Sequence, residues 1–206
     1  MTQASFPFEG IDTTETQFSQ WARNFNSGVD DVPTGTALQV SAGTGLAVNV
    51  AAGEAMVRGH YYTSDAVESL ALATADATND RLDLVVLKLD PTANSITLVV
   101  KTGTPAGSPT APSLVQTDAG IFEQPLAEVL VPATSGVPTT ITDRREFMGT
   151  RLGSWTTAGR PTPAGRVLFG FNTTTGAVEY YDTNESAWTP VGGGLGFEGQ
   201  FLLGGM

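Results

Sequence analysis

The sequence lacks cysteine altogether and has a single histidine, His60, among its 206 residues. Without cysteine the chain can form no disulfide, no thiolate metal site and no thiol nucleophile. Any histidine-based catalytic triad or zinc site would have to be built on His60 alone. We favour a structural role for His60, because no nucleophile motif such as Gly-x-Ser-x-Gly accompanies it.

Charged residues are also scarce, at 15% against ~25% in a typical domain, and they are mostly acidic, with a formal net charge of −11. This excess of negative charge argues against binding to nucleic acid or to anionic membranes. No apolar run approaches the ~18 residues that a membrane-spanning helix needs. The first residues, MTQASFPFEG, lack the basic and apolar regions of a signal peptide, so we expect no export signal.

The sequence does contain many turn-forming residues, since its 24 glycines and 12 prolines fall between short apolar runs. That pattern is typical of an all-β protein. We predict an antiparallel β-sandwich or barrel-like domain over residues 36–148, preceded by an arm with one helix over residues 1–35. A small β-hairpin module over residues 149–191 and a glycine-rich tail over residues 192–206 should follow.

The arm is expected to hold the helix because Thr14 and Gln17 have the spacing of a capping box, and Gly28 offers a C-terminal stop. One apolar stripe at helical spacing consists of Phe18, Trp21, Ala22 and Phe25. The stripe could pack on the chain's own sheet or on a neighbouring chain, and both alternatives stay open.

Strands are predicted from short apolar runs bounded by turn residues, at 46–50, 54–58, 81–89, 95–101, 122–133, 139–143, 166–171 and 177–182. The runs at 81–89 and 95–101 should form a hairpin, because a turn rich in proline, asparagine and serine separates them. The runs at 166–171 and 177–182 should form a second hairpin. Gly59, inside a strand pattern, is expected to mark a bulge.

The segment NDRLDLVVLKLD, residues 79–90, places charges at the start of a strand whose two faces are both apolar further along. A charge at the start of a buried strand must be paired and hydrogen-bonded. We therefore predict a structural ion pair for Asp83. Its first-choice partner is Arg144 or Arg145, which close the domain, and its second choice is Arg81.

The remaining carboxylates are scattered and show neither catalytic nor metal-ligand spacing. No catalytic residue, metal or cofactor is therefore predicted, and we expect the protein not to be an enzyme. A pair of carboxylates facing each other across a cleft, as in glycosidases, stays open as an alternative.

The second region contains two tryptophans and two tyrosines, namely Trp155, Tyr180, Tyr181 and Trp188. They could form a stacking platform for a sugar, or they could fill the small core of the hairpin module, which is the favoured interpretation.

A region of about forty residues is too small for a strong core of its own, so we expect it to pack on the first domain or on copies of itself. The apolar residues expected to contact other chains are Phe18, Trp21, Phe25, Phe197, Phe201, Leu202 and Leu203.

Three stretches resemble the N-terminal anchoring domain of bacteriophage tail-tip and baseplate proteins, which include receptor-binding, fibre-adaptor and minor tail proteins. They are GLAVNVAAGEAMVRGHYY, NDRLDLVVLKLDPTANSITLVVKTGTPAGSPTAP and PLAEVLVPATSGVPTTITDRR, and the resemblance covers about residues 36–147. The second region, GRPTPAGRVLFGFNTTTGAVEYYDTNESAWTPV, is similar to short hairpin modules of phage fibres.

The resemblance implies a structural virion protein at the tail tip or baseplate, made in the host cytoplasm and commonly a homotrimer. Its role would be that of a fibre adaptor or minor tail protein, which anchors or connects the host-recognition apparatus. The implied partners are other tail or baseplate proteins and a glycan of the host surface, with neither nucleic acid nor membrane insertion.

Two other classes of protein stay open, a carbohydrate-binding receptor-recognition module and a cell-wall hydrolase. A glycan array separates the first, because an isolated binding module should give a hit. Zymography on host cell walls separates the second.

Overall fold

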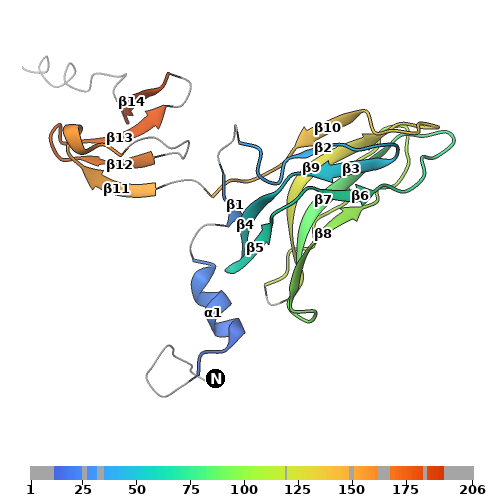
Figure 1. Cartoon of the computed structure of the whole chain (residues 1–206), viewed down its shortest axis with the longest axis horizontal. Helices are drawn as coiled ribbons and strands as arrows, with labels where there is room; N and C mark the ends of the chain where they lie inside the picture. The colour runs from blue at the N-terminus through green and yellow to red at the C-terminus, as the bar shows by residue number, and fades with distance from the viewer. Residues whose placement is uncertain are drawn as a thin grey trace, which may run out of the picture. The chain divides into compact units, whose positions relative to one another are not determined.

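The structure is a computed structural model that describes residues 12–24, 27–31, 35–118, 120–148, 151–161, 168–182 and 185–192 (Figure 1). The chain divides into two compact units, Met1–Met148 and Gly149–Met206. Strands make up 45% of the described residues and helices 7%, so the prediction of an all-β fold with one α-helix is confirmed. Within the ranges described, no helix is long and apolar enough to cross a bilayer.

The first unit contains one helix and ten strands among its described residues: α1 (Glu15–Ala22), β1 (Gly28–Val29), β2 (Val40–Ala42), β3 (Ala47–Val50), β4 (Gly53–Val57), β5 (His60–Ser64), β6 (Glu68–Ala71), β7 (Arg81–Asp90), β8 (Ser95–Lys101), β9 (Phe122–Val131) and β10 (Thr140–Asp143). They form three antiparallel sheets with the orders β1-β4-β5, β2-β3-β6 and β10-β9-β7-β8. The predicted hairpin of β7 and β8 is present, with Leu87 opposite Leu98.

The core of the first unit is lined by aliphatic side chains from all three sheets, including Val48, Val50, Val57, Val85, Leu87 and Val129. β7 lies between β8 and β9, and Val85, Val86 and Leu87 are fully buried, so both faces of this strand are covered as the sequence predicts. Each fully buried valine or leucine contributes about 1.5–3 kcal/mol to stability. The start of β7 is thereby fixed at the centre of the unit.

Gly59 does not form the predicted bulge. It occupies a two-residue turn between β4 and β5, where Arg58 and Gly59 have φ angles of 48° and 81°. Positive φ at both central residues is the geometry of a tight type I′ hairpin turn, which glycine favours at the second position. Where the sequence predicted a bulge within one strand, the structure has a turn that connects two strands.

α1 begins as predicted with a capping box. The Thr14 side chain accepts a hydrogen bond from the Gln17 amide, and the Gln17 side chain accepts one from the Thr14 amide. The helix ends earlier than predicted, at Ala22, and Gly28 belongs to β1. A Cβ on Gly28 would lie 2.8 Å from Glu146 O, so this glycine serves a close approach between two distant segments and not a helix stop.

The second unit contains β11 (Arg151–Trp155), a short 3-10 helix η1 (Thr157–Gly159), β12 (Leu168–Asn172), β13 (Ala177–Asp182) and β14 (Ala187–Pro190). The predicted hairpin of β12 and β13 is present, and the sheet order is β11-β12-β13-β14. β11 pairs with β12 in parallel, a pairing that the sequence did not predict. Most of the predicted tail, residues 193–206, lies outside the described residues.

Candidate functional site

The charges at the start of β7 form a buried structural pair. Arg81 Nε donates to Asp83 Oδ1 at 2.7 Å, and Arg81 Nη2 donates to Asp83 Oδ2 at 3.2 Å. Arg81 is 3% exposed and Asp83 is fully buried. The remaining donors of Arg81 reach the carbonyl oxygens of Thr74 and Ala73, at 3.0 and 2.8 Å. The pair therefore ties the segment before β7 to the sheet.

Asp83 also fixes the loop that follows β8, because the Gly103 amide donates to Asp83 Oδ1 at 2.8 Å. A Cβ on Gly103 would lie 2.0 Å from Leu82 O, so only glycine can approach β7 this closely. At the far end of the same loop, buried Glu123 accepts the Val115 amide at 2.6 Å and pairs with Lys101 Nζ. No local pattern in the sequence predicted this second anchor.

The predicted partners of Asp83 were ranked in the wrong order. Arg144 pairs with Glu128 at 3.0 Å, with the Arg144 side chain 51% exposed. Arg145 pairs with Asp143 at 2.7 Å and donates to Ala37 O, also at 2.7 Å. Both arginines hold the end of β10 in place, as the sequence suggested, but they pair with Glu128 and Asp143 and not with Asp83. The Arg145 hydrogen bond also holds the pKa of Asp143 below its ordinary value.

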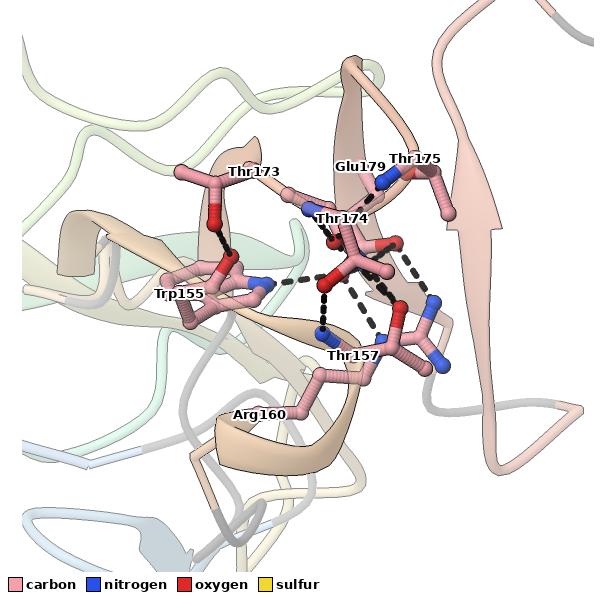
Figure 2. A network of polar contacts seen from close by, with 8 residues as sticks. Trp155, Thr157, Arg160, Thr173, Thr174, Thr175 and Glu179 are labelled. Carbon is pink, nitrogen blue, oxygen red and sulfur yellow. Dashed lines mark hydrogen bonds and ion pairs between the residues drawn. The ribbon is translucent and has the colours of Figure 1, made fainter.

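The second unit is organised around one carboxylate, Glu179, which is 1% exposed (Figure 2). Trp155 Nε1 donates to Glu179 Oε1 at 2.6 Å, and Arg160 donates to both carboxylate oxygens at 2.9 and 2.7 Å. The Asn172 side-chain amide adds two contacts, at 3.1 and 3.2 Å. One carboxylate thus joins β11, β12, β13 and the segment after η1.

These contacts make the second unit sensitive to acid. The Arg160 hydrogen bond, assisted by those of Trp155 and Asn172, lowers the pKa of Glu179 from 4.5 to about 2 despite its burial. A carboxyl whose pKa falls on folding stabilises the fold above its unfolded pKa and loses this effect as the pH falls through its folded pKa. We expect thermal melts of the second unit to be constant above pH 5 and to shift down between pH 4.5 and 2.

Tryptophan fluorescence measures this, because Trp155 and Trp188 both belong to the second unit and a Trp21→Phe background removes the third tryptophan. The Glu179→Gln variant is the control, since it cannot ionise and should lack this pH dependence. An equal acid shift in that variant would assign the sensitivity to another group.

The two tryptophans and two tyrosines of the second unit do not form one platform. Trp155 and Tyr181 both contact Trp188 edge to face, with ring centroids 5.0 and 5.6 Å from it. Tyr180 points to the opposite face of β13, because neighbouring strand residues alternate. Trp155 is 9% exposed and its indole nitrogen is bound to Glu179, so it supports the core instead of offering a surface.

The helix aromatics predicted as assembly contacts are exposed, Phe18 by 54% and Trp21 by 52%. α1 packs on the body through its small residues: Ser19 Oγ donates to Arg58 O at 2.8 Å, and Ala22 lies against Gly59. Arg23 and Arg58 both donate to Asp118, which fastens the helix end. The other predicted assembly residues, Phe25, Phe197, Phe201, Leu202 and Leu203, lie outside the described residues.

His60 contacts a carboxylate of the helix, with its Nε2 at 3.2 Å from Glu15 Oε1. This contact joins β5 to α1 and supports the structural role expected for the histidine. In the described part of the chain, His, Asp and Glu side chains form no group of three that could hold a metal ion.

Comparisons of the chain with protein-family models, with curated proteins and with solved structures find no match.

Proposed function

We propose that this protein is a structural component of a bacteriophage tail tip or baseplate, which anchors or connects the host-recognition apparatus as a fibre adaptor or minor tail protein. The observation that carries the proposal is that the buried carboxylates make structural contacts. Asp83, Glu123 and Glu179 each bind a basic side chain and fix neighbouring backbone or side chains. Carboxylates engaged in this way stabilise an architecture.

The resemblance of residues 36–147 to tail-tip and baseplate domains points the same way. That stretch falls inside the first compact unit, which ends at Met148. The low content of charged residues suits a chain whose surface is largely covered by other chains.

The direct test is to look for the chain in particles. Mass spectrometry of purified virions of the encoding phage should detect it, and immunogold labelling should place it at the tail tip. Its abundance in infected cells together with its absence from purified virions would contradict the proposal.

Assembly is a separate prediction, because the exposed aromatics of α1 and the small second unit are better buried against other copies. Light scattering of the full chain should give about three times the 21.4 kDa of one copy, as expected for a homotrimer. A chain ending at Gly149 should give a smaller assembly, since residues 150–206 are expected to contribute to subunit contacts. A full chain that stays monomeric at high concentration, with the shortened chain behaving identically, would rule the assembly out.

A carbohydrate-binding function is not favoured, because Trp155 is buried and Tyr180 faces away from the other aromatics. A hit for the purified protein on a glycan array that is lost in Trp188→Ala, with the second unit still folded, would restore it. Cell-wall hydrolysis that survives purification and is abolished by replacing one carboxylate would show that the protein is an enzyme.

A further inference from the structure

The sheet of the second unit has two faces of different character. Trp155 and Glu179 lie on one face and belong to the buried network described above (Figure 2). Residues that alternate with them along the strands lie on the other face. We call this second surface the open sheet face, and it is formed by Ser154, Phe169, Phe171, Val178, Tyr180, Thr189 and Val191.

Three apolar side chains form a row across the open sheet face. Phe171 lies opposite Val178 in the pairing of β12 with β13. Val191 follows β14, and its amide donates to Val178 O at 2.8 Å, which continues the β13–β14 ladder by one pair. The three side chains are 44%, 38% and 52% exposed, in the order Phe171, Val178 and Val191. Exposed apolar side chains in cross-strand register form a continuous patch, and covering it removes apolar area from water.

The two rows of the open sheet face contain no charged side chain. The second row consists of Phe169, Tyr180 and Thr189, which lie opposite one another across β12, β13 and β14. The next residue on this side of β13 is Asp182, at the end of the strand, where its carboxylate accepts the Glu185 amide at 3.3 Å. The chain as a whole has a net charge of −11. Copies that meet through the open sheet face therefore keep most of their negative charge outside the contact.

A second copy of the chain is the partner that fits this surface. A sheet with an apolar face needs a second layer to cover it, and small units commonly gain that layer by oligomerising. Apolar side chains beside the hydroxyl groups of Ser154, Tyr180 and Thr189 are complementary to the same surface on another copy. A strongly charged partner would instead have to bury its charge there without a counter-charge.

We propose that the second units of neighbouring copies pack with their open sheet faces against one another, with Phe171 and Val178 at the centre of the contact. In the homotrimer expected above, three such faces would surround the threefold axis. Each copy would thereby supply the apolar layer that its neighbours lack. The contact rests on the structural function proposed above, because that role brings several copies of the chain into one assembly.

Analytical ultracentrifugation of the full chain tests the contact. Val178→Asp places a carboxylate in the apolar row, and the concentration at which half of the chains are associated should rise at least about a hundredfold. Phe171→Ser removes apolar area without adding charge, and should raise this midpoint about tenfold. The matched control is Thr175→Asp, which adds the same charge at an exposed position of the β12–β13 turn and should change the midpoint less than about twofold.

Two further measurements accompany the variants. The emission of Trp155 and Trp188 in the Trp21→Phe background shows whether the second unit is folded in each variant, and Phe171→Ser decides if Val178→Asp unfolds it. In a mixture of isotope-labelled and unlabelled copies, filtered nuclear Overhauser spectra report contacts between copies alone. The Phe171 ring of one copy should contact the Val178 methyl groups of another.

Unchanged association in folded Val178→Asp and Phe171→Ser variants would overturn the contact, as would the absence of Overhauser contacts between copies at the open sheet face. A full chain that is monomeric at every concentration would overturn the contact together with the homotrimer. The proposed function has a separate readout, which is the presence of the chain in purified virions. A chain that is found in virions and associates equally well with Val178→Asp would keep that function and lose only this contact.

Discussion

Replacing Asp83 with alanine is expected to lower the free energy of unfolding of the first unit by about 3–5 kcal/mol. The variant leaves Arg81 buried, with its charge uncompensated and with only the carbonyl contacts to Thr74 and Ala73. It also leaves the Gly103 amide without its carboxylate. Arg81→Ala should cost a similar amount, because it leaves Asp83 as the uncompensated buried charge. Denaturant titrations followed by circular dichroism measure both losses.

Two variants serve as controls for the buried pair. Arg144→Ala removes an exposed ion pair with Glu128, and we expect it to change stability by less than about 1 kcal/mol. Asp90→Ala, at the β7–β8 turn, should cost well under half as much as Asp83→Ala. If Asp83→Ala melts like the parent protein while a binding or catalytic activity is lost, the charges at the start of β7 are a functional site and the structural interpretation is wrong.

Replacing Glu179 with alanine is expected to unfold the second unit while the first unit remains folded. Without Glu179, Arg160 loses its ion-pair partner, and the buried donors of Trp155 and Asn172 lose their hydrogen-bond acceptor. We expect this to cost on the order of 3 kcal/mol. A unit this small has little stability in reserve. In the Trp21→Phe background, the emission of Trp155 and Trp188 should shift to that of solvated indole at 25 °C.

The amide NMR spectrum shows whether this loss is confined to one unit. Peaks of the second unit should collapse toward unfolded positions in Glu179→Ala, and peaks of the first unit should stay in place. The control is Glu185→Ala, because Glu185 is an exposed residue of the same unit. A folded second unit in Glu179→Ala would show that the network does not hold the sheet together.

What the sequence predicted well depends on residues close together in the chain. The capping box of α1 needs only Thr14 and Gln17, and the β7–β8 hairpin needs only two apolar runs and a turn. The central position of β7 followed from apolar residues on both of its faces. The end of α1 was wrong because Gly28 is used by a contact with Glu146, more than a hundred residues away.

The candidate sites were harder to predict, because their partners are set by pairings between distant segments. The sequence showed that Asp83 needs an arginine, but Arg144 and Arg145 are directed to other carboxylates once Asp143 lies opposite Ala127 of β9. Glu179 could have been noticed as a charge on the inward face of a predicted strand. Its partners come from β11, whose parallel pairing no local pattern predicts, and from Arg160 after η1.

The loop between β8 and β9 contains both positions that can change and positions that cannot. It is fastened at one end by the Gly103 amide on Asp83 and at the other by the Val115 amide on Glu123. Between these anchors, Gly107 has open space around the position of a side chain. In related chains we expect residues 107–112 to vary in length and composition, while Gly103 and Asp83 are retained or lost together. Such a loop can change the surface it presents to another molecule without altering the sheet that carries it.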